Sequence, residues 1–136
     1  MPQAVHGAGV RFDAPVGWKV TTARTSVSAT HDSQIVQVTT FPLVKRYDDS
    51  LFDKVKSELD LRMRAVAAQL RGPLGSSRTV TTGGIRSHTY DVTAGSDVLE
   101  YTFVLQGKRE FELLCRRPSS ASDDACKQLL ATFAIG

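Results

Sequence analysis

The two cysteines, Cys115 and Cys126, are the residues whose spacing points most directly to a bond. Cys115 ends a segment of alternating apolar and polar residues, and Cys126 lies early in the amphipathic segment that follows. A short connection would bring the helix start back over the strand end, within the roughly 4.4–6.8 Å between Cα atoms that a disulfide requires. A structural disulfide and a pair of reduced core cysteines both stay open. A redox-active pair is disfavoured because the spacing is not Cys-x-x-Cys.

Three histidines could act as bases, but none lies in a local nucleophile motif, and the chain has no Gly-x-Ser-x-Gly elbow. His88 lies within an expected strand, where a structural role is the preferred interpretation. An enzyme would have to assemble a site around His88, an acid and a nucleophile such as Ser87 or Tyr101. We interpret His31 as a turn residue and His6 as part of a mobile N-terminal tail.

The sequence predicts neither a metal site nor a cofactor site. It contains no His-x-x-x-His, Cys-x-x-Cys or EF-hand spacing. Residues 7–9, Gly-Ala-Gly, form a lone Gly-x-Gly without the third glycine of a dinucleotide loop. The net charge of +3 permits weak attraction to anions, yet no basic run is interleaved with stacking aromatics, which disfavours nucleic acid as a partner. No window is apolar enough to span a membrane.

The length of 136 residues predicts a single domain, 1–136, with a core that needs no metal to be stable. The N-terminal residues have neither a cationic region nor an apolar stretch typical of a signal peptide. We therefore expect a cytoplasmic protein if Met1 is the native start. If a leader has been removed and Cys115–Cys126 is oxidised, we expect an extracytoplasmic one.

Alternating residues predict short strands in the first third of the chain. They cover residues 9–13 and 18–20, and a hairpin of residues 27–30 and 34–41 with a polar turn at 31–33. Gly83-Gly84 predicts a second hairpin, between strands 78–82 and 85–92. A third, with the strongest alternation, joins strands 99–105 and 110–116 through a turn at Gln106-Gly107-Lys108. All of these connections are local and favour an antiparallel sheet.

Two amphipathic segments predict helices. Residues 48–70 carry one apolar stripe at intervals of three or four, with Asp48, Asp49 and Ser50 as N-cap candidates. The stripe consists of Phe52, Val55, Leu59, Met63, Val66 and Leu70. Residues 122–134 form the second helix, with a buried face of Ala125, Cys126, Leu129, Leu130 and Phe133. Because strands and helices do not alternate as βαβ units, we expect an α+β fold, an antiparallel β-sheet flanked by two α-helices.

Three segments carry a resemblance to a known family. Residues 10–18, Val-Arg-Phe-Asp-Ala-Pro-Val-Gly-Trp, resemble the phenylalanine-x-x-proline-x-glycine-tryptophan start of PsbP-like domains. Residues 84–90 resemble their glycine, short strand and tyrosine segment, and residues 125–133 are similar to their closing helix. The resemblance implies an α/β/α sandwich, with the sheet between helices, and no catalysis. The superfamily includes the photosystem II protein PsbP, a yeast Ran-binding import factor, small bacterial envelope lipoproteins and type VI secretion-effector chaperones.

We therefore expect a non-enzymatic binding or accessory domain, such as a chaperone or assembly factor with a protein partner. This interpretation requires exposed apolar surface on one sheet face, for which Ile35, Phe41, Val104 and Leu114 are the candidate liners. The first alternative is a carrier of a small molecule or lipid, which requires an apolar cavity of about 300 Å³ or more. The second is an enzyme with a site assembled around His88.

Overall fold

The computed structural model describes residues 2–136, which form a mixed α+β fold that is mostly strand. Five strands precede the first helix: β1 (Pro2–Gly7), β2 (Val10–Pro15), β3 (Lys19–Thr22), β4 (Ser26–His31) and β5 (Gln34–Tyr47). A 3₁₀ turn, η1 (Asp49–Leu51), leads into helix α1 (Phe52–Leu70). Then follow β6 (Arg78–Thr82), β7 (Ile85–Ala94), β8 (Asp97–Pro118), helix α2 (Asp124–Thr132) and β9 (Ala134–Ile135). The predicted α+β class with antiparallel pairing is confirmed.

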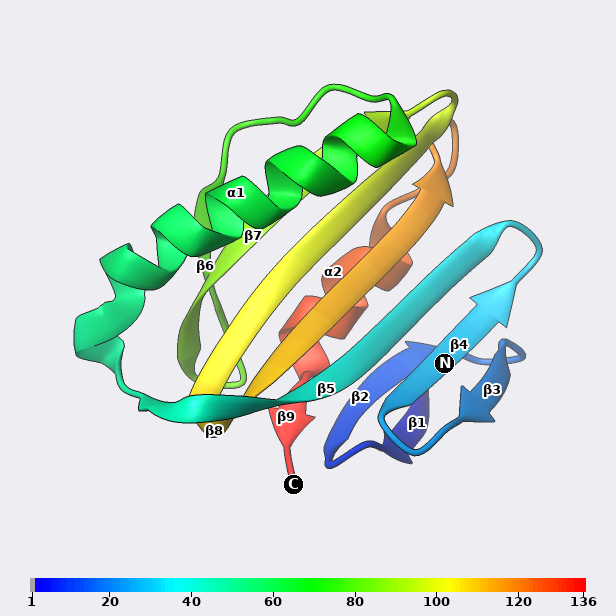
Figure 1. The fold of residues 1–136 in the computed structure, drawn as a ribbon. Helices are drawn as coiled ribbons and strands as arrows, with labels where there is room; N and C mark the ends of the chain where they lie inside the picture. Colours follow the sequence, from blue (N-terminus) through cyan, green and yellow to red (C-terminus); the bar gives the residue numbers. More distant parts are fainter. Residues whose placement is uncertain (1) are drawn as a thin grey trace.

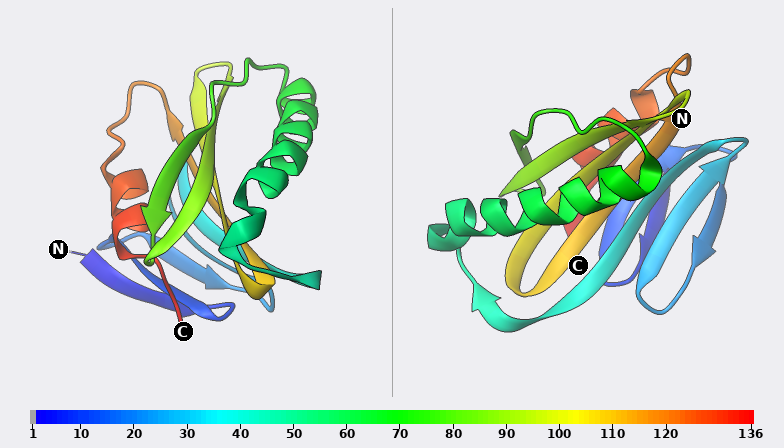
Figure 2. Two further views of the ribbon diagram at one scale, coloured as in Figure 1. Left: turned by 90° about the vertical axis from the view of Figure 1, so that its left-hand side faces the viewer. Right: turned by 45° about the horizontal axis from the view of Figure 1, so that its top comes forward.

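The main sheet has the order β3-β4-β5-β8-β7-β6, and neighbouring strands in this order pair antiparallel. A smaller sheet has the order β1-β2-β9. Helix α1 lies on one face of the main sheet, and α2 lies on the other, beside the small sheet (Figures 1 and 2).

Strand β8 is a hairpin in itself, because it doubles back near Gly107 (Figure 1). Asp97 and Arg116, at its two ends, form an ion pair of 2.7 Å, whereas 19 residues of straight strand would separate them by about 60 Å. The first arm pairs with β7 and the second with β5. Gly107 adopts φ +60°, the left-handed conformation that such a turn needs. The predicted hairpin is therefore confirmed.

The N-terminal tail was the clearest wrong prediction. Residues 2–7 form β1, which pairs with β2 so that His6 lies opposite Arg11. Ala8 and Gly9 both have positive φ, as a two-residue hairpin turn requires. The Gly-Ala-Gly segment thus makes a tight turn, and the first strand predicted at 9–13 is the second strand of the fold.

Both predicted helices exist, with later starts than predicted. Asp48 caps η1 by accepting a hydrogen bond from the Ser50 amide, and α1 begins only at Phe52. Helix α1 ends with Arg71 in the left-handed conformation, at φ 53°. In α2, Ser122 accepts from the Asp124 amide, and the helix ends before Phe133.

Two apolar clusters fill the two sides of the main sheet. Beneath α1, Leu59 and Met63 pack on Tyr90, Leu99 and Phe103. On the α2 side, the cluster joins α2, the small sheet, β4, β5 and the second arm of β8; it includes Phe12, Val27, Val38, Leu113, Leu129 and Phe133. Of the remaining predicted helix residues, Val55, Val66, Leu70 and Leu130 are only half-buried at the margins of these clusters.

The cysteines lie together, as their spacing suggested. Cys115 is near the end of β8 and Cys126 is in the first turn of α2, and both are buried in the α2-side core. Their Cα atoms are 5.6 Å apart and their sulfur atoms are at bonding distance. This separation is close to the commonest value for disulfides.

We predict that oxidation of this pair stabilises the fold by about 3 kcal/mol, because the bond closes a short loop in the unfolded chain. The measurement is urea unfolding of the wild type and of Cys126→Ser, each with and without reductant. Reductant should lower the stability of the wild type alone. Equal curves for the oxidised and reduced wild type would contradict the prediction.

We also predict that Gly107→Ala destabilises the domain by about 1 kcal/mol through backbone conformation alone. A Cβ at Gly107 would meet no atom within 4 Å, so sterics add nothing to the cost. Gly107→Asn should cost less, since asparagine tolerates positive φ better. Gly136→Ala, which has open space and no positive φ, is the control for thermal melts. Equal melting of both alanine variants would disprove this role of Gly107.

Candidate functional site

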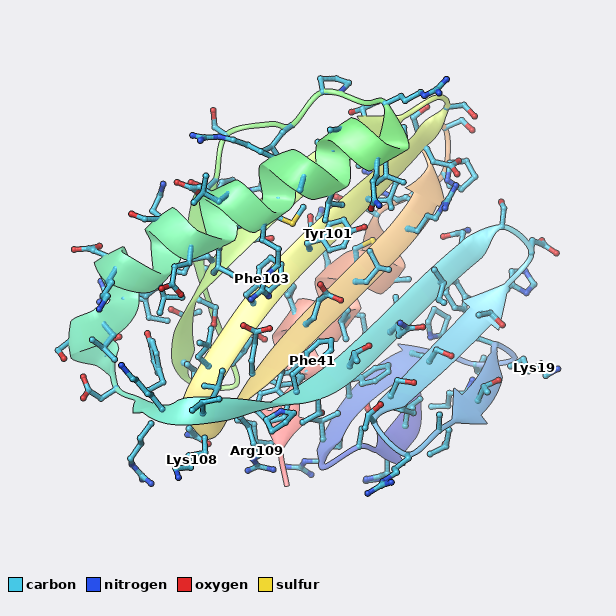
Figure 3. The ribbon with its side chains drawn as sticks, viewed as in Figure 1. Lys19, Phe41, Tyr101, Phe103, Lys108 and Arg109 are labelled. Atoms are coloured by element: carbon cyan, nitrogen blue, oxygen red, sulfur yellow. A yellow bond between two sulfur atoms is a disulfide. The ribbon has the colours of Figure 1, made fainter. Side chains whose placement is uncertain are left out.

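The face of the main sheet that carries α1 is only partly covered, because the helix lies over β7 and the first arm of β8 (Figure 3). Beyond the helix, β5 and the second arm of β8 present four cross-strand pairs on this side. We call these residues the open face: Ile35 with Arg116, Gln37 with Leu114, Thr39 with Glu112, and Phe41 with Glu110. Their neighbours that point to the opposite side, such as Val38 and Leu113, are fully buried.

Three of the four residues expected to line an apolar face lie together here. Ile35 and Leu114 are half-buried, and Phe41 is 39% exposed. Val104 is the exception: it is fully buried in the α2-side core. It was misplaced because it belongs to the first arm of β8, whose even-numbered residues point away from α1.

Two glutamates occupy the centre and one end of the open face, in different environments. Glu110 is 5% exposed and forms a 2.8 Å ion pair with Arg62 of α1. Glu112 is half-buried and forms no ion pair or side-chain hydrogen bond within residues 2–136. Burial raises the pKa of Glu112, the negative charge of Glu110 raises it further, and Arg62 partly offsets both.

Tyr101 adds a hydroxyl group near Glu112. It lies on the first arm of β8, is 9% exposed, and its hydroxyl has no hydrogen-bond partner within residues 2–136. Its pKa is raised by burial and then by the charge of Glu112. Gln37 donates to the Thr39 hydroxyl at 3.3 Å. The centre of the open face therefore offers a carboxylate and a hydroxyl that the chain itself leaves without partners.

One end of the open face runs into a crevice of about 260 Å³ between β5 and α1. The register of β5 against β8 shifts there: Pro42 lies opposite Arg109 and Tyr47 opposite Gly107. The intervening residues 43–46 form one wall of the crevice. Its apolar lining comprises Leu43, Val44, Tyr47, Leu51, Val55, Leu59 and Leu105, and its charged lining comprises Lys45, Arg46, Lys54, Glu58, Arg62 and Glu110.

His88 is packed against the start of helix α1. His88 is 2% exposed, and its ring stacks on that of Phe52 with 3.8 Å between the ring centres. Its Nε2 lies 3.0 Å from the Phe52 carbonyl oxygen and donates to it in the tautomer that carries the proton on Nε2. Burial lowers the pKa of His88. Ser87 precedes His88 in β7, so its side chain points to the other face of the sheet, where its hydroxyl donates to the Ile85 carbonyl. Tyr101 is paired with Tyr90 in the neighbouring strand. These candidates are not brought together.

Three further features raised by the sequence are His31, a possible metal site and a possible membrane span. His31, expected in a turn, is the last residue of β4 and pairs with Gln34 beside the turn. Its ring stacks on Trp18, and its Nε2 lies 3.4 Å from a carboxylate oxygen of Asp32. Among residues 2–136 no group of three or more His, Cys, Asp or Glu side chains converges as metal ligands would. None of the helices in the described chain has an apolar stretch that could cross a bilayer.

The sequence analysis missed Glu112 and the crevice. The available signal was the pair Glu110 and Glu112 on the polar side of a strand whose other side is apolar. What alternation cannot show is which cation reaches which carboxylate, because Arg62 comes from another element, 48 positions away in sequence from Glu110.

Comparison with known proteins assigns no family. No family model matches the chain, and no curated protein matches it. Among solved structures, the chain resembles a crystal structure of a protein from Bacteroides thetaiotaomicron VPI-5482, with a TM-score of 0.66 and 13% sequence identity. The match covers 94% of this chain and 45% of that protein, so this chain spans less than half of its length. At this identity the likeness concerns the fold alone.

We predict that Glu112→Gln stabilises the isolated domain at pH 7. The folded pKa of Glu112 is raised, so the folded state holds this proton more tightly than the unfolded chain, and ionisation costs stability as the pH rises through that pKa. The gain should vanish below the pKa of an unfolded glutamate. Urea unfolding of both proteins at pH 3 and pH 7 measures the difference. A less stable variant at pH 7 would contradict the expected sign.

Proposed function

We propose that this is a non-enzymatic accessory domain, of the kind of a chaperone or assembly factor, that binds a segment of another protein on its open face. The observation that carries the proposal is Glu112, a partly buried carboxylate that has no cation of its own. Such a group lowers the stability of the free domain and becomes favourable only when a partner supplies a positive charge. The partner segment we propose is therefore amphipathic and contains a lysine or arginine.

The surroundings of Glu112 support this kind of ligand. Leu114 and Ile35 offer apolar surface on one side of the glutamate, and Phe41 offers it near the other end of β5. The Tyr101 hydroxyl can donate to a backbone carbonyl of the bound segment. Helix α1 borders the face and would restrict the orientation of the segment along the strands, as grooves for peptides commonly do.

The PsbP-like kinship stays part of the proposal. It is supported by residues 10–18, which form β2 and the turn after it, by a closing helix at the predicted place and by helices on both faces of one antiparallel sheet. Members of one fold differ in their partners, so kinship alone does not select a ligand. A carrier is a weaker candidate because that role requires an apolar cavity. The crevice of about 260 Å³ has six charged residues in its lining, and a larger hollow of about 440 Å³ is open and bordered by Asp48, Asp49 and Arg86.

Site-specific photo-crosslinking in the native host tests the proposal. A photoreactive phenylalanine analogue replaces Thr39 on the open face, and Leu61, which is 64% exposed on α1, provides the control position. One defined protein should crosslink from position 39 and not from position 61, through a segment that contains a basic residue. Adding Glu112→Gln should reduce that crosslink.

Calorimetry with the purified partner then measures the charge contribution. Loss of a hydrogen bond to a charged group predicts an affinity at least about ten-fold lower for Glu112→Gln. Asp32→Asn, which removes one exposed negative charge in the β4–β5 turn, should leave the affinity unchanged. Equal affinities for wild type and Glu112→Gln, or a crosslinked segment without a basic residue, would refute the proposed binding mode.

A further inference from the structure

Five basic residues gather at the corner of the molecule where β5 passes the tip of the β8 hairpin. Lys108 and Arg109 follow the hairpin turn (Figure 3), and Lys45 and Arg46 lie on the irregular segment of β5 beside it. The Arg109 guanidinium is turned toward the α2 side, 5.2 Å from the centre of the Phe111 ring. Lys54, at the start of α1, lines the same crevice as Lys45 and Arg46. All five are exposed. We call this group the basic corner.

The side chains of the basic corner carry positive charge that no ion pair within residues 2–136 neutralises. Within residues 2–136 none of its five members forms a salt bridge. Six other basic residues do so: Lys56, Arg62, Arg78, Arg86, Arg116 and Lys127. Nearby acids are engaged elsewhere: Glu110 pairs with Arg62, Asp49 pairs with Arg86, and Asp48 caps η1. Only Glu58 adds an uncommitted negative charge to the crevice lining.

An apolar tip projects from the same corner. Val44 is 95% exposed and is flanked in sequence by half-buried Leu43 and by Lys45. Phe41, 39% exposed, and the exposed Pro42 precede it on the same strand. An aliphatic side chain this exposed gains nothing from the fold, and it would lose contact with water on entering an apolar medium.

We propose that the basic corner docks on an anionic phospholipid surface, with the headgroup phosphates bound by its lysines and arginines and Val44 inserted between the lipids. Each basic residue near such a surface strengthens binding, and the attraction falls off within a Debye length. A nucleic acid fits less well, because it offers no apolar medium for Val44 and the corner has no row of aromatic side chains for base stacking. The contact would be peripheral and reversible.

Sedimentation with vesicles tests the proposal on the intact chain. The protein should bind vesicles of phosphatidylcholine with 30% phosphatidylglycerol, bind vesicles of phosphatidylcholine alone far less, and be released by salt. Lys45→Gln with Arg46→Gln should lower the partition coefficient by more than about ten-fold, since each charge contributes about five-fold. Lys19→Gln with Arg24→Gln removes the same net charge at the β3–β4 edge and should retain most of the binding.

A second pair of variants isolates insertion. Val44→Ser should weaken binding to the anionic vesicles, and Leu61→Ser, an equally conservative change at another exposed position, should not. Both sites are exposed, so neither variant should affect folding, and circular dichroism checks this. Equal binding to the two vesicle types, or equal losses in both charge variants, would overturn the proposal. So would tighter binding to a DNA duplex that is insensitive to Val44→Ser.

Discussion

The turn of the β8 hairpin divides the apolar residues of one continuous segment between two opposite cores. In the first arm, Leu99 and Phe103 point under α1, and in the second arm Phe111 and Leu113 point under α2. All four positions are odd-numbered. In an antiparallel hairpin, odd residues of the two arms face opposite sides only when an even number of residues connects the arms. The opposite burial of the two arms therefore requires an even number of connecting residues near Gly107, and an odd number, such as the three residues 106–108, would place all four side chains on one face.

This division decides where the candidate site lies. Because the second arm and β5 direct their large apolar side chains toward α2, the opposite side of the same strands receives Thr39, Glu110 and Glu112. Helix α1 is held over the first arm and β7 by Leu59 and Met63, so it does not extend across β5. The open face is thus the reverse side of the strands that form the α2-side core.

Sequence periodicity was sufficient for the elements that repeat many times. The α1 stripe and the alternation on both arms of β8 were identified because each apolar contact recurs at the spacing of its own helix or strand. The N-terminal strand was missed because β1 has few apolar residues and is held mainly by backbone pairing with β2, beginning with Pro2 opposite Pro15. The side of the sheet predicted for Val104 was wrong, because one residue more or less in the β8 turn changes which residues of the two arms share a side. Tertiary pairing fixes that length, and local propensity does not.

The two glutamates show why the site is harder to predict than the fold. Glu110 and Glu112 are two residues apart on the same side of one strand, so any rule based on sequence treats them alike. Arg62 reaches Glu110, and one helical turn further along α1 the chain places Val66, an apolar residue at the margin of the α1-side core. Glu112 therefore has no ion pair of its own, and Arg62 offsets its charge only in part. This difference between two neighbouring carboxylates is the physical basis of our proposal that a basic partner segment binds at Glu112.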